Sequence, residues 1–191
     1  MRLNDPLVTS FEFEGEEYSI DLAFDNVLDV FDVMQDKLLR DHEKIEICLE
    51  LLLGDCFKEK ANNLFNLWSH IYDTFIHREE REIVEYDLQG NPLPVEKEEK
   101  KRLIDIDQDA EYIFASFKQA YGINLIEEQG KLHWNEFQAL LHGLPHHTIM
   151  KRVIEIRDWE PSKGDSAEYK RKMEKAQKRV ALPEEEEEDV D

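Results

Sequence analysis

The sequence predicts a mainly α-helical, compact domain with an N-terminal β-hairpin that packs on the helices. Three observations predict this fold class. Apolar residues recur every three or four positions over most of the chain, an alternating segment with a central glycine precedes them, and 41% of the 191 residues are hydrophobic. This amount of apolar side chain is enough for one well-shielded core, so we expect a single helical domain over residues 1–182.

The N-terminal segment 8–22, VTSFEFEGEEYSIDL, alternates apolar and polar residues on either side of Gly15. This period of two predicts a β-hairpin. An isolated hairpin is marginally stable in water, so its apolar residues are expected to lie on the helices that follow. Those residues are Phe11, Phe13, Tyr18, Ile20 and Leu22.

Three helices are predicted in the next part of the chain. The first has Asp25 as its N-cap and one apolar stripe formed by Val27, Val30, Phe31, Met34 and Leu38. The second starts near Asp41, ends at Gly54, and carries on one face Ile45, Cys48, Leu49 and Leu52. The third is the most apolar, and we expect the centre of the core in its aromatic face, formed by Leu64, Phe65, Trp68, Ile71, Tyr72 and Phe75.

The helical pattern fails at 86–99, where QGNPLP precedes a charged run, and this stretch is predicted to be a loop. A fourth helix then lies within 105–125 and ends at Gly122. Its apolar face consists of Ala110, Ile113, Phe114, Phe117 and Tyr121.

Further helices are predicted from their capping residues. Asn135, with Gln138 in a capping box, starts a helix that Pro145 ends. Another covers Ile149 to Ile156, and a capping box of Asp165 and Glu168 starts a basic helix over 168–180, EYKRKMEKAQKRV.

The chain has 45 acidic and 24 basic residues and a net charge of −21. Phosphate backbones and anionic membranes are repelled by such a charge, so neither nucleic acid nor membrane is an expected partner. Residues 183–191 hold five Glu and two Asp and are predicted to be a disordered acidic tail, while the acidity is expected to extend over the rest of the chain. In contrast, the predicted helix over 168–180 is basic. It is either attracted to the acidic remainder of the same chain or docks an acidic partner.

Targeting and redox signals are absent from the sequence. No N-terminal segment resembles a signal peptide and no apolar run is long enough to span a bilayer, so we expect a cytosolic protein. Neither Cys48 nor Cys56 has a neighbouring Cys or His at a metal-site spacing, and both are expected to be reduced.

Two patterns resemble metal sites and fail. In DIDQDAEYIFAS, Asp105, Asp107 and Asp109 match the first ligands of a calcium loop, but Ala110 replaces its glycine and Ser116 its closing glutamate. The histidines 133, 142, 146 and 147 form no HExxH, and Pro145 breaks the helix that would align them. We therefore expect no metal and no cofactor.

No catalytic machinery is recognisable. The chain has no GxSxG, no phosphate-binding glycine loop, and so many carboxylates that any pairing can arise by chance. We expect a protein that is not an enzyme, has no catalytic residues, and binds other proteins. Three side chains at helix edges or in connectors are the candidates for partner contact: Met34, Trp134 and Trp159.

Several segments together resemble a family from tailed phages and prophages of Gram-positive bacteria, the gene-product-fifteen family. They are DAEYIFASFKQAYGINL, KLHWNEFQALLHGLP and IMKRVIEIRDWEP, with FEFEGEEYSIDLAFDNVLDVF and EYKRKMEKAQKRVAL at either end. The resemblance covers about residues 8–182 and is interrupted at the proline-rich loop. None of these motifs carries a known chemistry.

The resemblance implies a tail assembly chaperone that acts in the host cytoplasm. Its partners would be the tape measure protein, a long amphipathic helix that aggregates, and the tail tube protein. Two alternatives remain open: a structural minor tail or connector protein of the virion, and, more distantly, an acidic DNA mimic that inhibits a host enzyme. The oligomeric state does not follow from the sequence.

Overall fold

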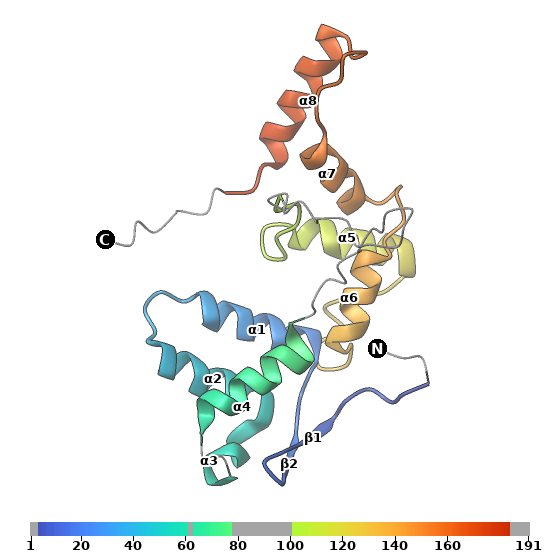
Figure 1. Cartoon of the computed structure of the whole chain (residues 1–191). Helices are drawn as coiled ribbons and strands as arrows, with labels where there is room; N and C mark the ends of the chain where they lie inside the picture. The colour runs from blue at the N-terminus through green and yellow to red at the C-terminus, as the bar shows by residue number, and fades with distance from the viewer. Residues whose placement is uncertain (1–3, 61–62, 78–100, 184–191) are drawn as a thin grey trace, which may run out of the picture. The chain divides into compact units, whose positions relative to one another are not determined.

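The computed structural model describes residues 4–60, 63–77 and 101–183. They are mainly α-helical with an N-terminal antiparallel hairpin, as predicted (Figure 1). The chain divides into two compact units. Unit 1 comprises 1–83 and 126–140, and unit 2 comprises 84–125 and 141–191. The predicted loop at 86–99 and nearly all of the predicted tail lie outside the described residues, and the single domain over 1–182 stays a prediction.

The hairpin of unit 1 consists of β1 (Ser10–Phe13) and β2 (Glu16–Ser19), which pair Phe11 with Tyr18. The two residues of the turn both have positive φ, Glu14 at 51° and Gly15 at 84°. Positive φ at both positions defines the type I′ turn, whose twist matches that of the strands, and this explains the glycine. The predicted hairpin is therefore confirmed.

Helix α1 (Phe24–Gln35) starts before the predicted cap, because Ala23 occupies the N-cap position. Asp25 lies in the first turn, where its carboxylate accepts the Gly130 N–H at 2.9 Å. Val27 and Val30 are buried as predicted, but Leu38 is 92% exposed. The helix ends at Gln35 and Asp36 adopts an extended conformation, so Leu38 lies outside the apolar stripe to which it was assigned.

Helix α2 (Asp41–Leu53) agrees closely with its prediction. The carboxylate of Glu43 accepts the backbone N–H of Arg40 at 2.9 Å and its guanidinium Nη2 at 2.7 Å, which stabilises the first turn. Cys48, Leu49 and Leu52 are buried. A 3₁₀ turn (Gly54–Cys56) and the short helix α3 (Phe57–Lys60) follow.

Helix α4 (Leu64–Ile71) continues into a π-helical turn (Tyr72–Ile76). Asn63 caps its start by accepting the Asn66 N–H at 3.2 Å. The buried side chains are Leu67, Trp68, Ile71 and Ile76, whereas Phe65 is 62% exposed. Part of the predicted aromatic core face is therefore wrong: Phe65 points to solvent, and the π turn buries Ile76 where a regular helix would place Phe75.

The first part of helix α6 (Trp134–His142) completes the core of unit 1. Phe24 stacks on Phe137 with ring centroids 5.0 Å apart, and Trp134 contacts both Phe31 and Phe137 at 5.6 Å. The two segments are also joined by backbone hydrogen bonds from Phe24 to Leu132 and from Trp134 to Leu22.

The start of α6 differs from the prediction. The His133 ring accepts the Asn135 N–H through Nδ1 at 3.1 Å, and Glu136 accepts the His133 backbone N–H at 3.3 Å. The capping residue is thus His133 rather than Asn135, with Glu136 taking the place predicted for Gln138. A histidine acceptor is not part of the usual capping signature, which explains the error.

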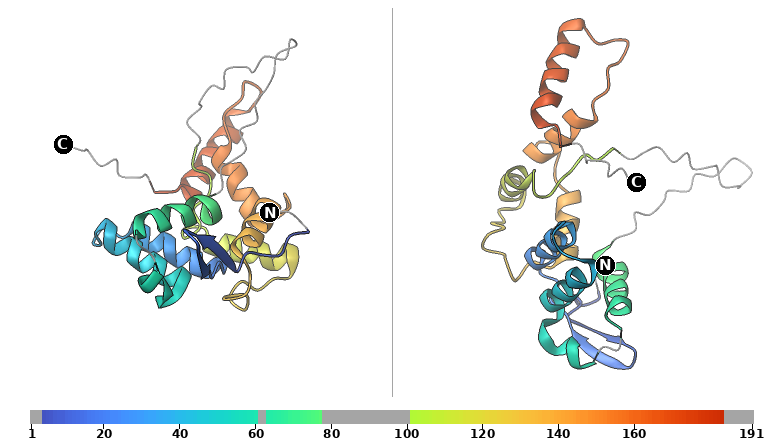
Figure 2. Two further views of the ribbon diagram at one scale, coloured as in Figure 1. Left: turned by 60° about the horizontal axis from the view of Figure 1, so that its bottom comes forward. Right: turned by 90° about the vertical axis from the view of Figure 1, so that its left-hand side faces the viewer.

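Unit 2 contains α5 (Ala110–Tyr121), α7 (Ile149–Asp158) and α8 (Ala167–Val180). Helix α5 ends as predicted at Gly122, which is left-handed with φ 72°. Helix α7 contacts both α5 and α8, and it meets α8 near the C-terminal end of that helix (Figure 2). The buried Ser116 hydroxyl accepts the Met150 N–H at 3.0 Å and so joins α5 to the first turn of α7.

Helix α8 is capped by Ser166, whose hydroxyl accepts the Tyr169 N–H at 3.1 Å. The capping box predicted from Asp165 and Glu168 is therefore one residue early. Asp165 instead accepts the Ser162 N–H at 2.8 Å and closes the preceding turn.

Candidate functional site

Aromatic side chains gather between the hairpin and α4 in unit 1. The Phe13 ring lies 5.1 Å from the His70 ring, and Phe11 lies 5.2 Å from Phe75 and 5.7 Å from His70. We call these four side chains, Phe11, Phe13, His70 and Phe75, the hairpin–helix cluster. All four are half-buried, while Tyr18 beneath Phe11 is buried. The cluster thus joins the core to the surface and keeps part of each ring accessible.

The surroundings of this cluster are acidic. Glu12, Glu14, Glu16 and Glu17 on the two strands and their turn are all exposed. Aromatic side chains surrounded by charged side chains are typical of protein interfaces, in which an apolar centre has a polar rim.

The three side chains proposed from the sequence as partner contacts lie in different environments. Trp134 is only 3% exposed and its indole N–H donates to the Ile76 carbonyl at 3.2 Å, so it belongs to the core rather than to an exposed edge. Met34 and Trp159 are half-buried. Trp159 contacts Tyr169 edge to face at 6.0 Å, in unit 2. Met34 and Trp134 belong to unit 1, whereas Trp159 belongs to unit 2. The hairpin–helix cluster was missed because its rings come from segments that the sequence does not show to be adjacent.

Helix α8 presents a cationic face to solvent. Its half-buried positions are Lys170, Met173, Ala176, Gln177 and Val180, and they mark the side toward the rest of unit 2. On the opposite side, Arg171, Lys175 and Lys178 are exposed and fall at spacings of four and three residues, so they form one line. Lys172 and Arg179 both lie on one side of that line, and the exposed Glu174 lies on its other side. None of these five cations forms an ion pair within the described residues.

The net charge is distributed unevenly between the units. Over the full sequence, unit 1 contains 23 acidic and 9 basic side chains, a net charge of −14. Unit 2 contains 22 acidic and 15 basic side chains, a net charge of −7, and residues 183–191 supply seven of its acidic side chains. The expectation that acidity extends over the whole chain is therefore wrong for the part of unit 2 that precedes residue 183, which has no net charge.

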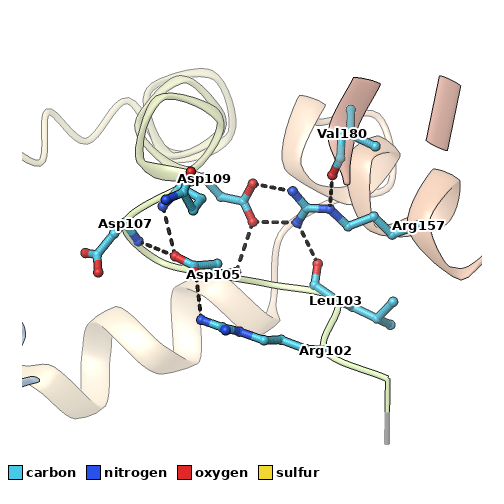
Figure 3. A network of polar contacts seen from close by, with 8 residues as sticks. Arg102, Leu103, Asp105, Asp107, Asp109, Arg157 and Val180 are labelled. Atoms are coloured by element: carbon cyan, nitrogen blue, oxygen red, sulfur yellow. Dashed lines mark hydrogen bonds and ion pairs between the residues drawn. The ribbon is translucent and has the colours of Figure 1, made fainter. Parts of the chain in front are cut away.

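A buried ion pair organises unit 2 (Figure 3). The Arg157 guanidinium donates to both carboxylate oxygens of Asp109 at 2.6 and 2.7 Å, and these side chains are 7% and 1% exposed. The same guanidinium donates to the Leu103 carbonyl at 2.8 Å and to the Val180 carbonyl at 2.6 Å. One side chain of α7 therefore binds the segment before α5, the start of α5 and the end of α8.

The aspartates that resemble a calcium loop are used within this network (Figure 3). Asp109 is held by Arg157, and Asp105 accepts the backbone N–H groups of Asp107 and Gln108 at 3.0 and 2.9 Å as well as a contact from Arg102. These contacts close the turn that leads into α5. Within the described ranges, no three His, Cys, Asp or Glu side chains are grouped so that they could hold a metal ion.

The histidines considered as zinc ligands are dispersed. His133 is buried and caps α6, whereas His142, His146 and His147 are exposed. His146 lies 3.5 Å from Glu155, an exposed contact.

Cys48 is fully buried in unit 1 and is a free thiol. Burial raises the pKa of the thiol to about 11, with the charge of Lys44 acting weakly in the opposite direction. This cysteine is therefore a protonated core residue at neutral pH.

None of the helices in the described part of the chain is both long and apolar enough to cross a bilayer.

The chain is thus a mainly α-helical protein of two compact units, each with more acidic than basic side chains. A model of the bacteriophage Gp15 protein family matches residues 3–182, which is nearly the whole chain. The protein therefore belongs to this family and is a phage structural or morphogenesis protein. No curated protein and no solved structure matches it.

Proposed function

We propose that this protein is a non-enzymatic tail assembly chaperone that acts in the host cytoplasm and binds the tape measure protein and the tail tube subunits. The observation that carries this proposal is the hairpin–helix cluster, four half-buried rings on a unit whose described residues have a net charge of −14. Family membership supports the phage context.

The cluster has the properties that a long amphipathic helix requires of its chaperone. Aromatic side chains are enriched at the centre of protein interfaces, and they order at low entropic cost because they have few rotatable bonds. Phe13 and Phe75 offer ring surface from two different elements, so an apolar helical stripe can contact both. The acidic remainder of unit 1 keeps such a complex dispersed by mutual repulsion.

Co-expression with the tape measure protein of the same phage tests this function. The wild-type protein is expected to keep the tape measure protein in the soluble fraction and to co-purify with it. The variant Phe13→Ser, checked for folding by circular dichroism, is expected to reduce the co-purified amount about tenfold or more, as for one aromatic hot spot.

The matched control is Ile126→Ser, which removes a 66% exposed apolar side chain from the same unit that is not a member of the hairpin–helix cluster. It is expected to leave co-purification unchanged. A tape measure protein that stays insoluble with wild-type protein and forms no complex would refute the chaperone function. Mass spectrometry of purified particles then distinguishes a chaperone, absent from the virion, from a tail component that remains in it.

A further inference from the structure

Helix α1 carries an acidic line that matches the cationic line of α8. Its buried side is marked by Phe24, Val27 and Val30. On the opposite side lie Asp25, Asp29, Asp32 and Asp36, at spacings of four, three and four residues. These spacings place the carboxylates of Asp25, Asp29 and Asp32 on one face of the helix, and Asp36 follows directly at its C-terminal end.

The acidic line is not neutralised within its own unit. Asp29 and Asp32 are exposed and form no ion pair within the described ranges. Asp25 accepts the Gly130 N–H and Asp36 accepts the Leu38 N–H, so the donor to each is an uncharged backbone group. The four aspartates thus extend over roughly 16 Å along the helix and its C-terminal end, at about 1.5 Å per residue.

The two lines are complementary in sign and spacing. Arg171, Lys175 and Lys178 follow each other at four and three residues, the same spacings as the first three aspartates. In the opposite chain direction, the spacings of these cations also match those of the last three aspartates, Asp29, Asp32 and Asp36. Two helices laid side by side can therefore bring three cations opposite three carboxylates in either orientation.

We propose that the cationic face of α8 docks on the acidic face of α1 of a second copy of this protein. Because each copy carries both faces, two copies can exchange the contact reciprocally, as in a closed dimer. The long-range repulsion between two acidic chains is screened beyond about 8 Å at physiological salt, whereas opposed side chains lie well within that distance. Each exposed pair contributes little, so association is weak, with a Kd on the order of 100 µM.

Charge reversal tests this contact. Sedimentation at protein concentrations around that value is expected to show a mass above that of the monomer for the wild type. Two triple variants are expected to be monomeric when each is alone. The α8 variant carries Arg171→Glu/Lys175→Glu/Lys178→Glu, and the α1 variant carries Asp29→Lys/Asp32→Lys/Asp36→Lys. Mixed in equal amounts they are expected to form a heterodimer, because the acidic α8 of the first variant faces the basic α1 of the second, and the native α1 of the first faces the native α8 of the second.

The control variant Lys118→Glu/Lys131→Glu/Lys163→Glu changes the net charge by the same amount as the first variant, at exposed positions outside both faces. It is expected to associate like the wild type. A monomeric wild type, or two folded charge-reversed variants that fail to associate when mixed, would overturn the proposal. Binding of an oligonucleotide that only the α8 variant loses would assign this face to nucleic acid and overturn it as well. The tape measure experiment is independent of these outcomes.

Discussion

Asp109 and Arg157 form a buried, two-pronged ion pair although 48 residues separate them in the chain. We predict that Asp109→Asn and Arg157→Met each lower the free energy of unfolding by about 3–5 kcal/mol, because either substitution leaves a buried charge without its partner. Urea denaturation followed by circular dichroism measures this loss.

The double variant Asp109→Asn/Arg157→Met is expected to lose less than the sum of the two single losses, because no charge remains buried. Losses below about 1 kcal/mol in both single variants would show that the pair contributes little to stability.

The hydrogen bond from Trp134 to Ile76 gives a second prediction. Trp134→Phe keeps an aromatic ring but removes the indole N–H, which leaves the Ile76 carbonyl without its donor in the core. The expected loss is about 1–3 kcal/mol in the free energy of unfolding. Trp159→Phe is the control, since that side chain is half-exposed, and a change within about 0.5 kcal/mol is expected.

The Cys48 thiol should be protected and should make stability depend on pH. Its pKa of about 11 in the folded protein exceeds the ordinary value of 9.0, so the unfolded chain loses its proton first as pH rises. The contribution of this thiol to the free energy of unfolding is therefore constant below about pH 9 and falls as pH rises toward 11.

In a Cys56→Ala background, a thiol reagent at pH 8 is expected to modify Cys48 only when the protein is unfolded by urea. Rapid modification of the folded protein would contradict the burial of this side chain.

Glu43 gives a prediction at acidic pH. Hydrogen bonds from the side chain and backbone of Arg40 lower the pKa of its carboxyl from 4.5 to about 2. The contribution of this carboxylate to the free energy of unfolding is fully present above pH 4.5 and is lost as pH falls toward 2, because the unfolded chain takes up the proton first. A nuclear magnetic resonance titration of the Glu43 carboxyl carbon should show the low midpoint, and Arg40→Ala should return it toward 4.5.

Local signals made much of the fold predictable. The glycine of the hairpin turn, the period of α2 and the left-handed Gly122 each depend on neighbouring residues, and all three agree with the structure. The family resemblance gave the phage context, which the match over residues 3–182 confirms.

Features that depend on distant residues were not predictable. Trp134 is buried because Phe31 and Ile76 come from other segments, and periodicity within α6 contains no information about them. In α4, the π turn shifts the apolar face by one residue, so a regular helical period assigns Phe75 where Ile76 lies in the core. The hairpin–helix cluster and the Asp109–Arg157 pair were missed for the same reason.

The return of residues 126–140 to unit 1 has a consequence for synthesis. Phe137 stacks on Phe24, and the Trp134 indole donates to the Ile76 carbonyl. The core of unit 1 is therefore built from two segments of the chain, which residues 84–125 separate in the sequence. A nascent chain that has left the ribosome only as far as α4 lacks these rings and cannot close that core. The hairpin and helices α1 to α4 therefore keep apolar surface exposed after their synthesis until α6 has also left the ribosome.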